Sequence, residues 1–184
     1  MTLSNSFESD RNKMPNNTPD GTEDQNVEYQ VGGFTIGPYR QALHAFMQGA
    51  QLQGALLCYA NLAHSLLAHA NLEGANLESA NLVFVSFENA KMANSDLKYA
   101  NLAGADLSGA DLSNANLKAA NLAYANLTGA NLKGAQMKGA NLANARLVSA
   151  NLTDVDLSEA NITETNFTYA NLTDTVFSDY RIPQ

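Results

Sequence analysis

A five-residue period runs through most of this chain and limits its possible folds more than any other feature. Between residues 45 and 184, 28 pentads follow one another without an insertion. The central residue of the pentad is Leu in 20 cases and another apolar residue in the remaining eight. The residue two places earlier is Ala in 21 pentads, and the residue between them is usually Asn or Asp. A phase kept over this length indicates a protein built from internal repeats.

Neither a regular helix nor a flat strand fits a period of five. In a helix, apolar residues five apart rotate by about 500° and form no continuous stripe. In a strand, the same spacing turns every second apolar residue outward. The pattern fits a chain whose Ala and Leu positions point inward across a short extended step, after which two residues turn a corner. Gly and Asn are frequent at the second of these two residues, as expected for a turn. We therefore predict a solenoid with Leu and Ala filling its axis.

The tandem phrase A-(N/D)-L-x-x, as in ANLAGADLSGADLSNANLKAANL at residues 100–122, resembles the pentapeptide-repeat protein family. The resemblance covers residues 45–184. The strict Ala-Asn-Leu pattern of this segment is similar to that of cyanobacterial members of the family. It implies an all-β solenoid, a right-handed quadrilateral β-helix with four pentads in each coil and about seven coils. The number four comes from the family and not from the period. The recurrence of Lys98, Lys118 and Lys138 at a spacing of 20 agrees with it.

Two segments precede the repeat. Residues 1–26 are rich in Ser, Asn, Asp, Glu and Thr. Such a segment cannot bury enough apolar surface to offset its ordering entropy, so we predict a disordered polar tail. Residues 27–44 are predicted to cap the N-terminal end of the solenoid, with β-type residues around Gly32 and Gly33. A short helix over about residues 39–47 is expected to begin after Pro38, because proline favours the first helical position.

The two ends of a solenoid expose unpaired strand edges and need covers. At the C-terminal end, Phe177, Tyr180 and Ile182 are predicted either to plug the axis or to pair with another molecule. A homodimer through an uncovered end therefore stays open. Apolar residues at outward positions, such as Phe84, also gather in the first coils. Either the segment 27–39 folds back over them, or they form part of a docking patch.

Composition excludes several classes of function. The formal net charge is −8, which opposes direct nucleic-acid binding by the molecule as a whole. The single cysteine, Cys58, cannot form an internal disulfide and suits a reducing compartment. The N-terminal residues contain no apolar signal region, and no run of about 18 apolar residues occurs. We expect a cytoplasmic protein that does not span a membrane.

The sequence offers no constellation for catalysis, for a cofactor or for a metal. A core filled by Leu and Ala leaves no concave polar site for chemistry. His44 and His64 are 20 residues apart and would stack in one column, but no Cys or carboxylate spacing accompanies them as metal ligands would require. Aspartates alternate with asparagines before the central residue, which indicates a hydrogen-bond acceptor at the corner. We predict a protein that is not an enzyme.

A column of lysines is the clearest candidate for binding. Lys98, Lys118 and Lys138 would stack about 4.8 Å apart on one face, beside Tyr99. Three like charges repel, and this cost favours a site for an acidic partner. Alternatively, the long lysine stems splay into water and Asp96 partly neutralises them. The candidate partner-binding residues are Lys98, Lys118, Lys138, Tyr99 and Phe84.

Two functions follow from these observations. The first is a noncatalytic protein–protein interaction or scaffold module that presents flat β-helix faces to an unidentified protein partner. The alternative rests on the resemblance, since some members of the family mimic DNA and protect DNA gyrase. Such a mimic needs a nearly continuous acidic surface. Residues 151–180 carry a net charge of −6, but residues 91–150 carry +3, and this basic middle opposes the mimic.

Overall fold

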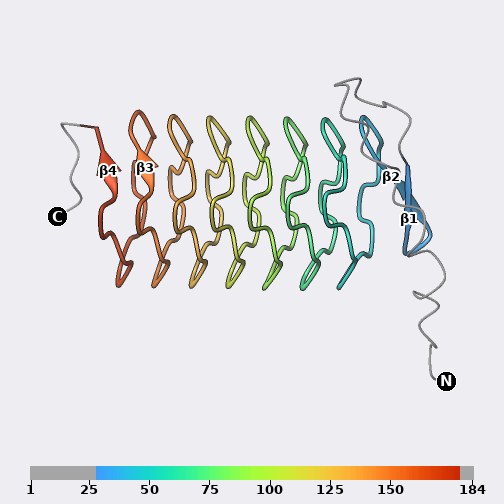
Figure 1. Ribbon diagram of the computed structural model, residues 1–184, viewed down its shortest axis with the longest axis horizontal. Helices are drawn as coiled ribbons and strands as arrows, with labels where there is room; N and C mark the ends of the chain where they lie inside the picture. Colours follow the sequence, from blue (N-terminus) through green and yellow to red (C-terminus); the bar gives the residue numbers. More distant parts are fainter. Residues whose placement is uncertain (1–27, 179–184) are drawn as a thin grey trace.

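The computed structural model describes residues 28–178, which form a rod of stacked coils with a β-hairpin at one end (Figure 1). Parallel bridges join the residue before each central position to the equivalent residue 20 places later, from Gln41 and Asn61 to Asn151 and Asn171. Twenty residues are four pentads, so the predicted quadrilateral β-helix is confirmed. The tail predicted over residues 1–26 lies outside the described residues.

The corners are tight turns of one kind. Every fifth residue from Tyr39 to Asp174 has a positive φ, which makes 28 corners and seven coils. At a typical corner the amide of Ala105 donates to the carbonyl of Leu102 at 3.0 Å, and Gly104 between them has a φ of +67°. A positive φ at the third residue defines a type II turn, which favours Gly and Asn there. The prediction that the chain turns at the two residues after each central position is therefore correct.

Stacking of the coils satisfies the backbone amides of each pentad, as residues 120–124 illustrate. The first amide closes a corner turn, and the second, third and fifth donate to carbonyls of neighbouring coils at 2.7–2.9 Å. The fourth amide, that of Ala123, donates instead to Oδ1 of Asn121 at 3.2 Å. The residue before the centre thus supplies the one acceptor that the neighbouring coils do not. Aspartates accept the same bond, as predicted: Asp96, Asp106, Asp111 and Asp156.

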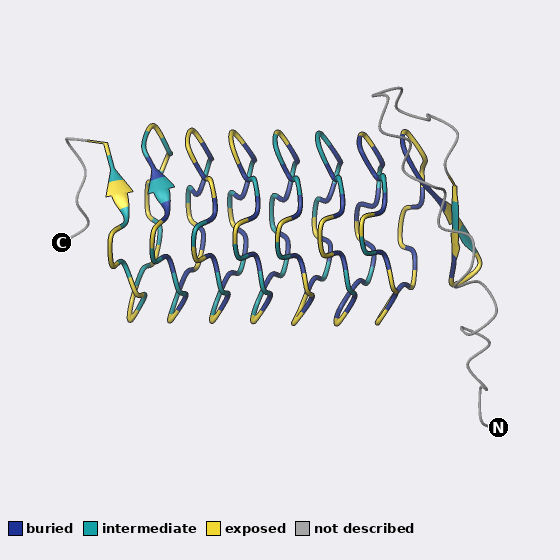
Figure 2. Cartoon of the chain, in the orientation of Figure 1, coloured by how far each residue is buried: buried dark blue, intermediate teal, exposed yellow. Residues whose placement is uncertain are grey.

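The core is a continuous column along the axis of the rod (Figure 2). No central residue from Met47 to Leu157 is more than 2% exposed. Two inward positions hold serine instead of alanine, and both hydroxyl groups are paired. Ser65 donates to the carbonyl of Ala42 at 2.9 Å, and Ser95 donates to that of Met92 at 2.7 Å. No buried side-chain nitrogen or oxygen among residues 28–178 lacks a hydrogen-bond partner.

A β-hairpin covers the N-terminal end of the core. Strands β1 (Tyr29–Val31) and β2 (Phe34–Ile36) pair in antiparallel fashion. The two residues between them, Gly32 and Gly33, both have positive φ, as the twist of a two-residue hairpin requires. Val31 and Ile36 are buried in the same apolar cluster as the first coils. The hairpin therefore hides the first Leu and Ala layer from water.

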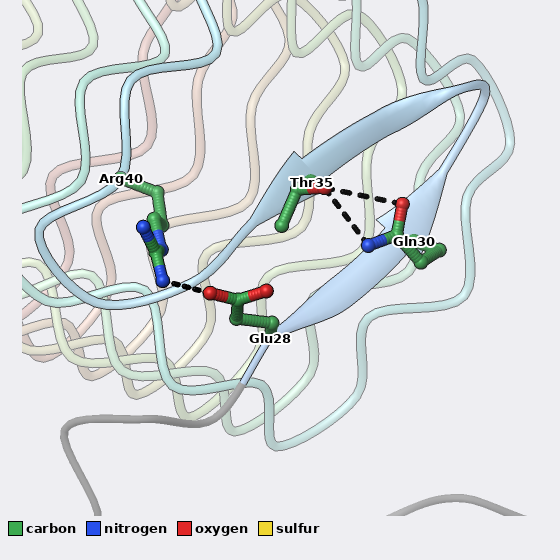
Figure 3. A network of polar contacts seen from close by, with 4 residues as sticks. All are labelled: Glu28, Gln30, Thr35 and Arg40. Carbon is green, nitrogen blue, oxygen red and sulfur yellow. Dashed lines mark hydrogen bonds and ion pairs between the residues drawn. The ribbon is translucent and has the colours of Figure 1, made fainter.

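Polar contacts fix the hairpin in place (Figure 3). The carboxylate of Glu28 pairs with the guanidinium of Arg40, and the side chains of Gln30 and Thr35 bond across the two strands. The amide of Leu56 donates to the hydroxyl oxygen of Tyr29 at 3.0 Å, which ties the hairpin to the next coil.

The short helix expected over residues 39–47 is not formed. Tyr39 and His44 instead occupy corners with positive φ, and the amide of Ala42 donates to the carbonyl of Asn61 at 2.8 Å. The phase of the repeat continues one pentad earlier than Ala45, with Ala42 at a central position. Pairing with the next coil satisfies these amides, whereas an isolated helix of this length has a costly nucleus.

The C-terminal end is less completely buried than the rest of the core. Strands β3 (Asp156–Leu157) and β4 (Val176–Phe177) pair in parallel between the last two coils. The rings of Phe167 and Phe177 meet edge to face at 6.4 Å, and both are only partly buried. Tyr180 and Ile182 lie outside the described residues, so a plug or a pairing at this end stays a prediction. The described part of the chain contains no helix with the length and apolar character needed to cross a membrane.

Candidate interaction surfaces

The 20-residue coil places outward side chains of successive coils in columns. Bridges between neighbouring coils link Asp96 to Asn116 and Asn116 to Gln136. A lysine stands two residues after each of these positions. The three lysines, Lys98, Lys118 and Lys138, therefore stack along one corner. We call these three residues the lysine corner. Lys118 and Lys138 are exposed, and Lys98 is half-buried.

Contacts within the chain only partly neutralise the lysine corner. The Nζ of Lys98 lies 4.7 Å from the centre of the Tyr99 ring, which is a cation–π contact. The Nζ of Lys138 lies 3.2 Å from Oε1 of Glu159. Both side chains of this ion pair are largely exposed, and such surface pairs contribute only about 0–1 kcal/mol. Separating Lys138 from Glu159 therefore costs little.

Asp156 lies beside this corner and is held in its charged form. Hydrogen bonds from the side chain and the backbone amide of Ser158 lower the pKa of Asp156. The charges of Lys138 and Lys118 lower this pKa further, against the opposing effect of burial. A lowered pKa in the folded state means that the carboxylate stabilises the fold at neutral pH. This contribution is complete above the usual pKa of aspartate. It is lost as the pH falls from there through the lowered pKa of the folded state.

We accordingly expect Asp156→Asn to reduce the acid sensitivity of the rod. Asn keeps the oxygen that accepts the amide of Ser158 but carries no charge to be lost. The fall in melting temperature between about pH 5 and about pH 2 should be smaller in the variant than in the parent chain. Thermal unfolding followed by circular dichroism measures both falls, and equal falls would contradict the assignment.

A second surface is one entire side of the rod. It lies between the corner column that contains Tyr99 and the corner column that contains Phe84. Arg40, paired with Glu28, is its only Asp, Glu, Lys or Arg over six coils, whereas the other three sides all carry charged residues in these coils. We call this surface the neutral face and each of its six segments a rung: residues 39–44, 59–64, 79–84, 99–104, 119–124 and 139–144.

Exposed aromatic and apolar side chains concentrate on the neutral face. Of the nine large hydrophobic side chains that are exposed among residues 28–178, six lie on this face or its edges: Tyr39, Leu43, Tyr59, Phe84, Tyr99 and Tyr124. The edges form stacks. The rings of Tyr39 and Tyr59 are 4.8 Å apart, those of His44 and His64 5.1 Å, and those of His64 and Phe84 5.4 Å. The predicted stacking of His44 on His64 is therefore confirmed.

Gly104 allows the Phe84 ring to lie flat at its corner. A Cβ atom on Gly104 would lie 2.3 Å from a ring carbon of Phe84, and the φ of +67° is itself unfavourable for other residues. The hairpin leaves Phe84 59% exposed. The described part of segment 27–39 thus covers the end of the core and not this side chain, and a docking patch at Phe84 stays a prediction.

A ladder of amide side chains runs along the middle of the neutral face. In all but one step, the Nδ2 donates to the side-chain oxygen 20 residues earlier, at 2.7 Å from Asn61 to Gln41 and at 3.0 Å from Asn121 to Asn101. The ladder continues with Asn81, Asn141 and Asn161. Within the described residues, the one step of this ladder without such a bond is that between Asn81 and Asn101.

The structure divides the predicted binding residues between these two surfaces. The lysine corner is one surface, and Tyr99 stands at the border between it and the neutral face. Phe84 lies on the opposite edge of the neutral face. Sequence reasoning missed this face as a unit, although an inspection of residues at a spacing of 20 would have found it. Among the described residues, no three His, Cys, Asp or Glu side chains are placed to hold a metal ion.

Comparisons with known proteins agree with the fold. The family model described as pentapeptide repeats, in eight copies, matches residues 45–82, 80–118, 110–147 and 140–179. No curated protein matches the chain.

Three solved structures illustrate the likeness. A pentapeptide repeat protein from the thylakoid lumen of Arabidopsis thaliana is 35% identical over 49% of this chain, with a TM-score of 0.48, and only 63% of that protein is covered. HetL, involved in heterocyst differentiation regulation in Nostoc sp. strain PCC 7120, is 26% identical over 77% of this chain and 89% of its own, with a TM-score of 0.32. QnrB1, a plasmid-mediated fluoroquinolone resistance protein, is 19% identical over 86% of this chain and 89% of its own, with a TM-score of 0.43.

Proposed function

Because this chain belongs to the pentapeptide-repeat family, we propose that it is a noncatalytic module that binds another protein along one side of a rigid rod. The inward positions are filled by apolar side chains and the backbone amides are used in stacking, so these residues are committed to the fold. Sequence freedom remains at the outward positions of each pentad. Binding therefore falls to the columns that these positions form.

The lysine corner is the surface that we assign to the protein partner. Three cationic side chains from successive coils share one column, and this alignment carries the proposal. The partner is an acidic segment of another protein, because carboxylates complement a row of ammonium groups and speed association. Tyr99 holds the Lys98 ammonium in place at one end of the row. The weak pair between Lys138 and Glu159 opens when the partner binds.

A DNA-mimicking role receives less support from the surface. A mimic has to present negative charge along its length, as DNA does. Basic residues lie on three sides of the middle coils, at Lys91 and Lys133, at Arg146 and at the lysine corner. The longest run of acidic residues without a basic one lies near the C-terminal end, at residues 154, 156, 159, 164 and 174.

A paired set of triple variants tests the proposal. Replacing Lys98, Lys118 and Lys138 by Ala should weaken capture of an acidic protein partner by about tenfold or more, because three stacked charges are lost together. The matched control replaces Lys91, Lys133 and Arg146 by Ala, which removes the same charge from other sides of the rod.

Proteins captured by the full chain and by each variant are compared by quantitative mass spectrometry at two salt concentrations. The partner should be lost only from the lysine-corner variant and should elute as salt rises. Equal capture by all three chains would show that the lysine corner is a solvated surface with no partner.

A further inference from the structure

We propose that the neutral face binds a second copy of this chain in an antiparallel two-fold dimer. This inference goes beyond the proposed function, which uses the lysine corner; the two surfaces meet at Lys98 and Tyr99. In such a dimer the two rods lie face to face and point in opposite directions. The first rung of one copy then meets the sixth rung of the other, the second meets the fifth, and the third meets the fourth.

Charge and period both favour a second copy as the occupant. The chain carries a net charge of −8, so two copies repel each other in general. The neutral face is the one side on which they can approach without burying unpaired charges. Its rungs repeat about every 4.8 Å, and a second copy has the same repeat by identity. A fit at one rung therefore recurs at every rung, which no unrelated surface guarantees.

Side-chain sizes along the Tyr edge of the neutral face complement each other in this arrangement. Along the Tyr edge, the rungs hold Tyr39, Tyr59, Ser79, Tyr99, Ala119 and Gly139 in order. Rotation about the two-fold axis places each tyrosine opposite a small residue: Tyr39 opposite the partner's Gly139, Tyr59 opposite the partner's Ala119, and Tyr99 opposite the partner's Ser79. Large side chains facing small ones interlock two flat surfaces, as they do in packed cores.

The neighbouring column of outward residues shows the same relation. Leu43 faces the partner's Ala143, and Val83 faces the partner's Ala103. In an arrangement with parallel rods, by contrast, the two-fold axis runs along the rods and sets the Tyr edge against the opposite edge at the same rung. Tyr39 would then face the partner's His44, and Tyr59 would face the partner's His64. The sizes therefore favour the antiparallel arrangement, in which Tyr124 and the partner's His64 are the one pair of rings that face each other along the edges.

The centre of the face is suited to lie on the two-fold axis. The axis passes between the third and fourth rungs, which contain Asn81 and Asn101. This is the step at which the amide ladder has no bond, so the amide of Asn101 is available to the partner's Asn81. The Phe84 ring lies against Gly104 in the fourth rung, and the two-fold rotation places the partner's Phe84 beside it.

One edge of the dimer gains a charge match. Glu78 and Lys98 immediately precede the third and fourth rungs, in the column that contains the lysine corner. The two-fold rotation brings Glu78 next to the partner's Lys98, and the reverse contact forms at the same time. Lys118 and Lys138 face the partner's uncharged Cys58 and Pro38, so no lysine opposes a lysine. The lysine corner remains open to solvent on the outer side.

Sedimentation of the full chain with a pair of single variants tests the dimer. The parent chain should sediment with twice the mass of one chain. Ala103→Glu places a carboxylate in the centre of the neutral face and should raise the dissociation constant by about a hundredfold, because the charge is buried twice in each dimer. The control Ala93→Glu changes the same residue type at the same pentad position on another face and should remain dimeric.

A size exchange tests the antiparallel register. Ala143→Leu sets two leucines against each other, and Leu43→Ala leaves a gap, so each change alone should weaken the dimer by about tenfold. The double variant restores a leucine opposite an alanine and should recover the parent affinity. A parallel dimer would show no such recovery.

Three outcomes would overturn the proposal. The first is a chain that stays monomeric at high concentration, which would leave the lysine-corner assignment untouched. The second is a dimer that Ala103→Glu does not weaken, which would place the contact at an end of the rod. The third is a dimer that dissociates steeply as salt rises, because contact through a neutral face should persist in salt.

Discussion

Replacing Leu107 by Lys is expected to unfold the middle of the rod. The Leu107 side chain is completely buried among the central coils, and no carboxylate reaches the axis there to pair with an ammonium group. Burying an unpaired charge should remove at least about 4 kcal/mol from the free energy of unfolding. Because each coil is stabilised by its two neighbours, the defect separates the rod into two parts. Hydrogen exchange of the backbone amides, followed coil by coil, measures the effect.

The adjacent residue provides the control for this experiment. Ser108 points outward at the next position of the same pentad and is only partly buried. Ser108→Lys adds the same charge to the same coil and should change the melting temperature little. We expect protection to be lost first on the C-terminal side of Leu107, since the hairpin covers only the N-terminal part. A Leu107→Lys chain that melts like the Ser108→Lys chain would mean that the axis admits water.

Replacing Ile36 by Asp is expected to detach the N-terminal hairpin. Ile36 is completely buried where β2 meets the first coil. A carboxylate at that position should cost about 2–5 kcal/mol, through the lost apolar contact and the burial of an unpaired charge. The first coil would then expose its strand edge, and an uncovered edge pairs with other chains. We therefore expect aggregation in addition to a lower melting temperature.

Thr35 serves as the matched position for this variant. It is exposed on the same strand, and an aspartate there keeps an oxygen that accepts the bond from Gln30 Nε2, so Thr35→Asp should leave the hairpin attached. Light scattering during heating distinguishes the two variants. Hydrogen exchange should show that Ile36→Asp frays the first coils and spares the last ones, unlike the defect at Leu107. Loss of protection along the whole rod would indicate that the solenoid unfolds as a single cooperative unit.

The sequence specifies the repeat almost completely, because each pentad position has one physical task. Leu107 and its equivalents must be apolar, and Gly104 and its equivalents must adopt a positive φ. Asn121 and its equivalents must accept a hydrogen bond from one backbone amide. These needs recur every five residues, so the solenoid and its corners could be predicted. The number of pentads in a coil could not be obtained from the period, because any number of identical sides satisfies the same local rules.

The first pentads and the surfaces were harder to predict, for two different reasons. Ala42 takes a central position without a leucine, and Pro38 suggested a helix start, so a local signal concealed the beginning of the repeat. The neutral face is defined by residues 20 apart, such as Tyr39 and Tyr59, and becomes visible only when the size of the coil is known. Outward side chains obey no repeat, so their grouping depends on the three-dimensional stacking.

The four-cornered coil has a consequence for changes in the length of this chain. A deletion of five residues removes one side of the square, so everything after it turns by a quarter and every column is broken at that point. If the deletion lies between Lys98 and Lys118, Lys118 and Lys138 move to a different side from Lys98. A deletion of twenty residues shortens the rod by about 4.8 Å and keeps every column aligned. Natural variation in length that preserves these surfaces should therefore occur in whole coils and not in single repeats.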